Sequence, residues 1–286
     1  MLELIERAKV LKEMTAKGDV FEPLKNKTLA MIFSKSSTRT RVSFEVGMQQ
    51  LGGCAINLNP KDTQIGRGEP LEDTARVISS MVDAVMFRTD LHSNLSTFVS
   101  NSSVPVINGL SDDFHPCQLL ADLLTLSELR GDIKGSTIAW VGDGNNVCHS
   151  YMNASRIFGF TLNVATPKEF QANNTITKKN QESVVLYNDP KEAVKNADVV
   201  VTDTWASMGQ ENEKELRKIA FEGFSVDDKL MSLAKPDAVF LHCLPAYRGQ
   251  EVSASVLEGK HSAVFQAAEN RLHAQKALLE YLLAYH

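Results

Sequence analysis

A cluster of hydroxyl and guanidinium side chains at residues 36–41 is the most chemically distinctive segment of the sequence. It comprises Ser36-Ser37-Thr38-Arg39-Thr40-Arg41 and lies between an apolar run and a helical pattern. Hydroxyl side chains at a helix start cap free backbone N–H groups, but the positive end of the helix dipole disfavours arginine there. A bound anion removes this conflict, because a helix N-terminus already binds phosphate well. The segment therefore predicts an anion site, with a capped helix and a surface arginine pair as the alternative. It lacks the G-x-x-x-x-G-K-[ST] pattern of a nucleotide P-loop.

Further polar clusters stand directly after the apolar runs that the sequence predicts as strands. In open parallel α/β sheets, ligands bind beyond the carboxyl ends of the strands. The clusters at these positions are Asn59–Glu69, Arg88, Asn108–Gln118, Asp143–Asn146, Asp203–Gly209 and His242–Arg248. We therefore expect the functional residues among them.

Two of these clusters suit particular ligand groups. His115 and Gln118 stand one turn apart at a helix start, where they could donate to a carbonyl oxygen and a phosphate. Asp203 suits an anchor for a ligand ammonium, with Ser207 assisting. Each also has a structural alternative, because a lone histidine often only completes hydrogen bonds and an aspartate can cap a helix.

Three other features have simpler interpretations. The segment GDGNN at 142–146 follows a predicted strand, but the third glycine of a dinucleotide turn would fall at Val147. We interpret it as a tight strand-to-helix turn rather than a nicotinamide site. Taken alone, Cys243 is interpreted as a small buried hydrophobe rather than a covalent nucleophile, and Arg271 as a solvated or ion-paired helix residue.

Composition excludes several classes of protein. The chain has 286 residues, of which 43% are apolar and 23% charged, and its net charge is −5. This mild acidity disfavours a general nucleic-acid or anionic-membrane binder, and no apolar run is long enough for a membrane span. The N-terminus lacks the features of a signal peptide. Four cysteines without paired spacing predict reduced thiols in a cytosol and no metal site.

Short apolar runs alternate with helical patterns along the whole chain. Such runs without polar alternation suit strands buried on both faces. The predicted strands cover 28–33, 54–58, 84–87, 104–108, 137–142, 161–165, 183–187, 198–203, 238–243 and 262–265. The alternation predicts an α/β fold with two Rossmann-like domains, each a mainly parallel sheet flanked by helices.

Two long helices are predicted to join these domains. The first begins at Pro116, carries a stripe of leucines and ends before Gly131. The second covers residues 267–286. The predicted domains are therefore 1–130 and 131–266, with the helix at 267–286 packing back on the first domain.

The motifs, taken in order, match one family over nearly the whole chain. They are SSTRTR (36–41), QIGRGEP (64–70), MFR (86–88), HPCQ (115–118), GDGNN (142–146), DTWASMG (203–209), HCLPAYRG (242–249) and AENRLH (268–273). The chain resembles the ornithine carbamoyltransferases (ornithine transcarbamylases) of the aspartate/ornithine carbamoyltransferase family. STRTR with HPxQ is shared across carbamoyltransferases, whereas D-x-x-x-S-M-G with HCLP is typical of the ornithine enzymes. The match starts partway into the family's first helix and the segment 166–184 is compact, but neither departure removes a motif residue.

The resemblance implies that the first domain binds carbamoyl phosphate and the second binds L-ornithine. The residues implied to bind carbamoyl phosphate are Ser37, Thr38, Arg39, Thr40, Gln64, Arg88, His115, Gln118, Cys243, Leu244 and Arg271. Those implied to bind ornithine are Asn146, Asp203, Ser207 and Met208. The implied catalytic residues are Arg39, Arg88, His115, Asp203 and Cys243, and Leu244–Pro245 is implied to be a cis peptide bond.

The implied reaction transfers the carbamoyl group from carbamoyl phosphate to the δ-amine of L-ornithine. Its products are L-citrulline and phosphate, as in arginine biosynthesis or the urea cycle. No cofactor and no metal is expected, because carbamoyl phosphate is already activated. The resemblance also implies a homotrimer with active sites shared between subunits, in which Gln64 reaches a neighbouring subunit's site. Nucleic acid and membranes are not expected partners, and the expected location is the cytoplasm.

Three alternatives remain at this stage. The first is a sister carbamoyltransferase that acts on another amine, such as putrescine or an acylated ornithine. The second is a non-catalytic binder of a phosphorylated metabolite on the same fold, and the third is a nicotinamide dehydrogenase. The Ser207-Met208-Gly209 segment disfavours the first. The intact set of motif residues disfavours the second, and the incomplete glycine turn disfavours the third.

Overall fold

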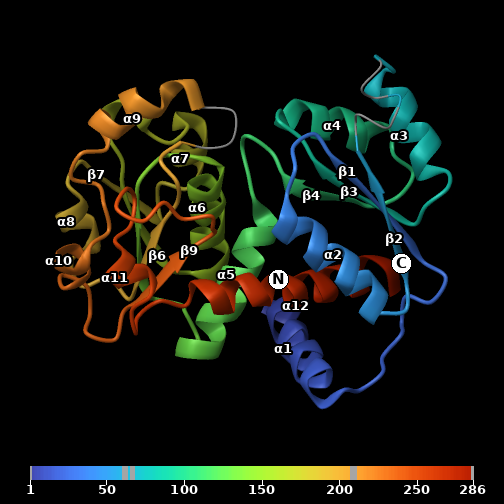
Figure 1. The fold of residues 1–286 in the computed structure, drawn as a ribbon, viewed down its shortest axis with the longest axis horizontal. Coiled ribbons are helices and arrows are strands. Elements are labelled where there is room, and N and C mark those ends of the chain that lie inside the picture. The colour runs from blue at the N-terminus through green and yellow to red at the C-terminus, as the bar shows by residue number, and fades with distance from the viewer. Residues whose placement is uncertain (1, 60–63, 65–67, 207–210, 285–286) are drawn as a thin grey trace. The chain divides into compact units, whose positions relative to one another are not determined.

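The computed structural model describes residues 2–59, 64, 68–206 and 211–284, and it divides the chain into two compact units (Figure 1). Unit 1 comprises residues 1–124 and 269–286, and unit 2 comprises residues 125–268. The chain passes between the units inside two helices, α5 (Pro116–Arg130) and α12 (Val264–Ala284). Each unit contains one parallel sheet with helices, so the predicted fold class is confirmed.

Unit 1 is built on a four-stranded parallel sheet in the order β2-β1-β3-β4. Its strands are β1 (Thr28–Phe33), β2 (Cys54–Leu58), β3 (Ala84–Arg88) and β4 (Val106–Leu110). Its helices, besides parts of α5 and α12, are α1 (Leu2–Lys17), α2 (Thr38–Gln50), α3 (Leu71–Ser79) and α4 (His92–Asn101). The first three predicted strands coincide with observed ones to within one residue, and the fourth is shifted by two.

Burial in unit 1 follows the strand order. The central strand β1 is buried from Leu29 to Phe33, and Phe87 of β3 packs on Phe98 of α4 with ring centroids 5.2 Å apart. The edge strand β2 differs, because Cys54, Ile56 and Asn57 are exposed. Unit 1 therefore carries an open sheet edge with an apolar side chain on it.

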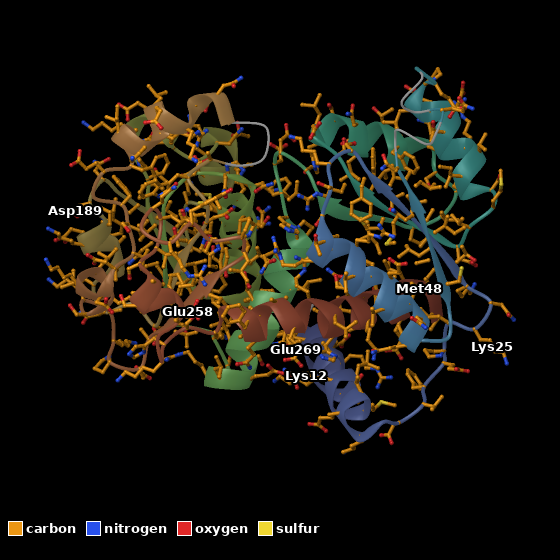
Figure 2. The ribbon with its side chains drawn as sticks, viewed as in Figure 1. Lys12, Lys25, Met48, Asp189, Glu258 and Glu269 are labelled. Atoms are coloured by element: carbon orange, nitrogen blue, oxygen red, sulfur yellow. The ribbon has the colours of Figure 1, made fainter. Side chains whose placement is uncertain are left out.

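The C-terminal part of α12 is held to α1 and α2 by partly buried polar contacts. Arg7 Nε lies 2.7 Å from Glu280 Oε2, and Lys276 Nζ donates to both Thr15 Oγ1 and Gln50 Oε1. Burial lowers the pKa of Lys276, although the Glu280 carboxylate opposes the shift. Figure 2 labels Met48 on α2, where the side chain is buried, and Lys25 in the segment before β1, where the side chain is exposed.

Unit 2 is built on a five-stranded parallel sheet in the order β7-β6-β5-β8-β9. Its strands are β5 (Thr137–Val141), β6 (Thr161–Ala165), β7 (Val184–Tyr187), β8 (Val199–Thr202) and β9 (Val239–His242). Its helices include α6 (Asn146–Phe158), α7 (Asn174–Lys179), α8 (Pro190–Val194), α9 (Lys214–Ala220), α10 (Asp228–Met231) and α11 (Ala254–Leu257), with short 3₁₀ turns η3 (Lys168–Phe170) and η4 (Glu211–Glu213). Strands β5, β8 and β9 are almost entirely buried, which explains their unbroken apolar sequences.

One predicted strand is wrong. The run at 262–265 forms a single parallel bridge between Phe240 and Ser262, and the chain then enters α12 at Val264. Phe240 accepts the amide hydrogen of Ala263 and donates its own to the His261 carbonyl. A short apolar run fits a buried helix start as well as a strand, and here the helix continues for five turns or more. Among the described residues, no helix combines the length and apolar character needed to cross a membrane.

Candidate active site

The helix start predicted as an anion site follows β1 directly. Ser37 is the N-cap of α2, with extended backbone, and its Oγ accepts the amide hydrogen of Thr40 at 3.4 Å. The capping alternative is therefore correct for Ser37. It does not account for the arginines, because only Arg41 turns outward, where its Nε lies 3.2 Å from Glu45 Oε2. Arg39 is half-buried and Thr40 is buried.

A buried guanidinium joins three segments of unit 1. Arg271 of α12 donates from Nη2 to Thr40 Oγ1 at 3.0 Å and from Nη1 to Gln118 Oε1 at 2.9 Å. Gln118 in turn donates from Nε2 to Asp122 at 3.0 Å. Arg271 is only 2% exposed, so it is not the surface residue that its position on a helix suggests. The start of α2, the start of α5 and the middle of α12 thus meet at one place in unit 1.

His115 lies within the electric field of the same group. Burial lowers its pKa well below 6.5, and the positive charges of Arg271, Arg88 and Arg39 lower it further, in that order. The imidazole is therefore neutral at physiological pH and can donate one hydrogen bond. Three guanidinium groups around a neutral buried ring create a positive site that suits a doubly charged phosphate. Beside it, burial raises the pKa of the Cys117 thiol to about 11, which makes that cysteine inert.

A cavity of about 660 Å³ opens beside the start of α2, on the side of the edge strand β2. Its lining includes Ser37, Thr38 and Arg41 of the anion motif and Asn57 of β2. Gln64, the remaining predicted residue of unit 1, is exposed, and its carbonyl accepts the Glu69 amide hydrogen. The contacts of the described residues do not bring Gln64 to the Arg271 group.

In unit 2, Asp203 is the centre of a second polar group. Its buried carboxylate follows β8 and accepts hydrogen bonds from Asn145 Nδ2 at 2.8 Å, Thr204 N at 2.7 Å and Cys243 Sγ at 2.9 Å. The predicted Asn146 begins α6 and is half-buried. The residue that reaches Asp203 is its neighbour Asn145, which the sequence analysis did not select. An asparagine directly before a helical pattern is a common N-cap, and this was the signal available.

Asn145 both caps a helix and donates a hydrogen bond to Asp203. Its Oδ1 caps α6 by accepting from Val147 N and Cys148 N, while its Nδ2 is directed to Asp203. The predicted residues Ser207 and Met208, with Gly209, lie outside the described residues.

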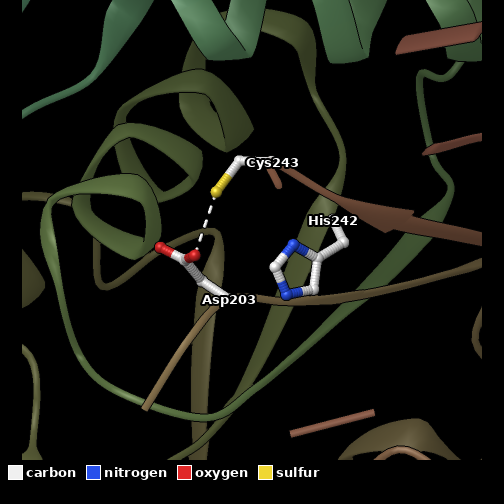
Figure 3. A group of neighbouring side chains, drawn as sticks. All are labelled: Asp203, His242 and Cys243. Carbon is white, nitrogen blue, oxygen red and sulfur yellow. Dashed lines mark hydrogen bonds between the residues drawn. The ribbon is translucent and has the colours of Figure 1, made fainter. Parts of the chain in front are cut away.

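Cys243 and Leu244 follow β9, and the Cys243 thiol donates to the Asp203 carboxylate. Figure 3 shows the Cys243 thiol directed at Asp203, with the His242 ring beside them. The Leu244–Pro245 peptide bond is cis, as predicted, and Leu244 has a φ of 56°. A left-handed conformation costs a non-glycine residue about 1–2 kcal/mol, so contacts around Leu244 must hold it there.

Asp203, His242 and Cys243 each offer a ligand atom within 4.8 Å of the others, which is compatible with a metal ion. However, the His242 Nδ1 atom accepts the Leu244 amide hydrogen at 2.9 Å, and the Asp203 oxygens already accept from protein donors. Binding a metal here would break hydrogen bonds that the structure has formed. These hydrogen bonds argue against a metal ion at Asp203, His242 and Cys243, and the expectation that the protein needs no metal stays a prediction.

A buried arginine that the sequence analysis missed supports this part of unit 2. Arg217 of α9 donates from Nη1 to Asp143 Oδ2 at 2.9 Å and to the Trp205 carbonyl at 2.7 Å. Its guanidinium carbon also lies 4.4 Å from the centroid of the Phe170 ring. One side chain thereby fixes the loops that follow β5, β6 and β8. No local pattern in KELRKIA distinguishes it from a surface helix residue.

Comparison with known proteins identifies the two regions. The family model described as the carbamoyl-P binding domain of aspartate/ornithine carbamoyltransferase matches residues 1–128. The model described as the Asp/Orn binding domain of the same enzymes matches residues 134–282.

Individual relatives agree with the family models. The chain is similar to ornithine carbamoyltransferase of Hydrogenovibrio crunogenus, with 57% identity over 99% of this chain and 93% of the relative. It is 59% identical to that of Nitrosococcus oceani, over 98% of this chain and 92% of the relative. Among solved structures, ornithine carbamoyltransferase from Pyrococcus furiosus superposes with a TM-score of 0.95 at 49% identity, covering 99% of this chain and 93% of that one. The chain belongs to the aspartate/ornithine carbamoyltransferase family.

Proposed function

We propose that this protein transfers the carbamoyl group of carbamoyl phosphate to the δ-amine of L-ornithine, producing L-citrulline and phosphate. The observation that carries the proposal is the group around Arg271, Thr40 and Gln118, with His115 under the field of three guanidinium groups. This group is positive, buried and rich in donors, as the phosphate dianion of an acyl phosphate requires. Full-length similarity to enzymes named ornithine carbamoyltransferase supports the choice of reaction.

In unit 1, we assign the phosphate group to Ser37, Thr38, Arg39 and Thr40 at the start of α2, where backbone N–H groups and the helix dipole add to the side chains. From the family motifs we assign the carbamoyl end to Arg88, His115, Gln118 and Arg271, and likewise to Cys243 and Leu244. Neutral His115 donates to the carbonyl oxygen. This donation strengthens as negative charge builds up on that oxygen in the transition state.

In unit 2, we assign ornithine to Asn146, Asp203, Ser207 and Met208. Asp203 is the natural anchor for the α-ammonium, because its carboxylate is buried at the end of β8 and held by three donors. Charge-assisted hydrogen bonds of this kind are among the strongest in proteins. Cys243 shares Asp203 Oδ1, so the anchor and the loop that carries the reacting end of the site are linked.

The reaction itself needs little chemistry from the protein. The neutral δ-amine attacks the carbonyl carbon and forms a tetrahedral intermediate. A proton of the attacking nitrogen then passes to the leaving group, the carbon–oxygen bond to phosphate breaks, and phosphate leaves as HPO₄²⁻ while the new carbamoyl–nitrogen bond remains. Arg39 stabilises the departing phosphate dianion. We expect no cofactor, no metal and no covalent enzyme intermediate. Most of the rate enhancement then comes from positioning two substrates and from preorganised donors.

We further infer a homotrimer in which Gln64 of one subunit completes the site of its neighbour. Exposed Val42 lines the cavity beside the anion motif, and Ile56 is a second exposed apolar side chain on the edge strand β2, as a subunit contact there would require. Mixing Gln64→Ala with Arg39→Ala protein and allowing subunits to exchange tests this. Sharing predicts that the mixture is more active than either variant alone, whereas unshared sites leave its activity at the level of the two variants. The four free thiols support a reducing location, and we place the protein in the cytoplasm.

The first test is citrulline formation from carbamoyl phosphate and L-ornithine by the purified protein. Ornithine-dependent product, blocked by the bisubstrate mimic N-phosphonacetyl-ornithine, is the expected result. Putrescine and N-acetylornithine serve as competing acceptors, and a preference for either would assign the protein to a sister activity. Tight binding of carbamoyl phosphate without turnover on any amine would instead indicate a binding role.

A further inference from the structure

The segment after β9 contains a buried pair, His242 and Glu251, that the proposed reaction does not use. Neither side chain reaches solvent. The His242 Nε2 atom lies 3.2 Å from Glu251 Oε1, and the His242 Nδ1 atom accepts the Leu244 amide hydrogen at 2.9 Å. Burying a carboxyl group and an imidazole costs free energy, and this cost must be offset by the hydrogen bonds that the two groups form.

The hydrogen bonds define the state of the imidazole. Because Nδ1 accepts from a backbone amide, it carries no proton, and the proton of the neutral ring is on Nε2. That proton is directed at the Glu251 carboxylate, which fixes both the tautomer and the ring orientation. The ring therefore presents a fixed acceptor to the backbone of Leu244.

Glu251 also holds the other end of the same loop. Its Oε1 accepts the Tyr247 amide hydrogen at 2.6 Å, in addition to the His242 proton. The loop between them contains Leu244 in its left-handed conformation and the cis bond to Pro245. Two backbone amides, three residues apart, are thus fixed by one acid–imidazole pair.

From this geometry we propose that His242 and Glu251 are positioning residues that hold Cys243 and Leu244 at the reacting end of the site. The inference rests on the proposed function, which assigns Cys243 and Leu244 to the carbamoyl group. The pair does not touch substrate. It acts through the Leu244 backbone, and through Cys243, whose thiol reaches Asp203 at 2.9 Å (Figure 3).

Two substitutions of His242 separate this role from simple space filling. Asparagine places its amide oxygen near the position of Nδ1, so His242→Asn keeps an acceptor for the Leu244 amide. Glutamine extends further and places its amide nitrogen near Nε2, so His242→Gln keeps the donor to Glu251 and loses the Leu244 acceptor. Glutamine is closer to histidine in volume, so a packing role favours it, whereas the proposed role favours asparagine.

The measurement is steady-state citrulline formation with both substrates varied. We expect kcat of His242→Gln to fall about 10- to 100-fold, since small displacements of a reacting group have effects of this size. We expect kcat of His242→Asn to stay within about fivefold of wild type, and both KM values to change by less than about threefold. Equal kcat values for the two variants, or a higher value for glutamine, would overturn the proposal. His261→Asn and His261→Gln are the control pair, because His261 only caps the Ala238 carbonyl outside the site.

Substitutions of Glu251 test the positioning role independently of His242. Glu251→Gln keeps a carbonyl oxygen for Tyr247 and His242, so its kcat should fall less than that of Glu251→Ala, which loses both acceptor contacts. A Gln variant as impaired as the Ala variant would count against the pair. If wild-type protein forms no citrulline, the proposed function has failed. If wild type is active but the asparagine and glutamine variants of His242 are alike, only the positioning role has failed.

Discussion

The guanidinium of Arg217 and the carboxylate of Asp143 form a buried ion pair, with Nη1 and Oδ2 2.9 Å apart. They come from different loops of unit 2, 74 residues apart in the chain. Asp143 precedes by two residues the asparagine that donates to Asp203, and Arg217 also holds the carbonyl of Trp205, two residues beyond Asp203. The pair thus connects the loop that carries Asn145 to the loop that carries Asp203, and it stabilises the proposed ornithine site.

Removing Arg217 should make the free energy of unfolding depend more strongly on pH. Burial raises the pKa of Asp143 from 3.8 to about 6, although Arg217 opposes the shift; Asp203 and Glu213 add to it. Because the folded-state pKa exceeds the unfolded one, the stabilisation of the protonated form is present at low pH and is lost as pH rises through about 6. Arg217→Gln leaves an unpaired buried carboxylate and raises its pKa further. We expect it to lose about 3–5 kcal/mol of unfolding free energy at pH 8 and clearly less at pH 5.

Urea unfolding at the two pH values measures this difference. Arg156→Gln is the matched control, because Arg156 is exposed on α6, and its effect should stay within about 0.5 kcal/mol at both pH values. Equal losses for Arg217→Gln at pH 5 and pH 8 would show that Asp143 does not respond to the arginine.

Arg39→Ala tests the phosphate site. The substitution removes a charge-assisted contact worth about 1.5–3 kcal/mol, so kcat/KM for carbamoyl phosphate should fall roughly 10- to 150-fold, and more if the charge acts mainly in the transition state. The fold should persist, because Arg39 lies on the first turn of α2 and is half-buried. Arg76→Ala is the control, since Arg76 pairs with Asp73 on the exposed face of α3. Unchanged kinetics in Arg39→Ala would remove the anion-site assignment.

The pH dependence of the rate should come from ornithine and not from His115. A primary amine like the δ-amine has a pKa near 10.4 and attacks only when neutral, so kcat/KM for ornithine should rise with pH from 6 to 9. The pKa of His115 is held far below this range by burial and by Arg271, Arg88 and Arg39. His115→Gln should therefore lower the rate while keeping the slope of the pH profile. A slope that changes in this variant would mean that His115 titrates during catalysis.

Asp203→Asn tests the ammonium anchor with little change in shape. The amide keeps an acceptor oxygen but loses the negative charge, so KM for ornithine should rise about 10- to 150-fold. KM for carbamoyl phosphate should change by less than about threefold, because its assigned phosphate contacts are in unit 1. A comparable rise in both KM values would indicate that Asp203 supports the site as a whole.

The elements of this fold could be predicted because their signals are local. Strands β1 and β5 are unbroken apolar runs, and the hydroxyl at residue 37 caps the helix that follows it. The run at 262–265 misled because four apolar or small residues fit a strand or a helix start equally well. The pairing with Phe240, more than twenty residues earlier, is limited to a single bridge at Ser262, and the helix begins at Val264.

The supporting residues of the site could not be predicted, because their roles depend on distant partners. Arg217 reaches Asp143 across 74 residues, and Arg271 reaches Thr40 across 231. By local pattern both arginines belong on a helix surface. Arg271 was placed at the site only because the segment around it matches a family motif, and Arg217 and Glu251 lie in no such motif.

The place of α12 in the chain has a consequence for synthesis. A nascent chain that has emerged through residue 124 contains the whole sheet of unit 1, yet it lacks the guanidinium that joins Thr40 to Gln118. That group arrives only after the ribosome has translated all of unit 2. We expect the growing chain to acquire the phosphate pocket late, so that a ribosome stalled before residue 271 displays a folded sheet with little affinity for carbamoyl phosphate. The binding of carbamoyl phosphate thereby reports that all of unit 2 has been translated.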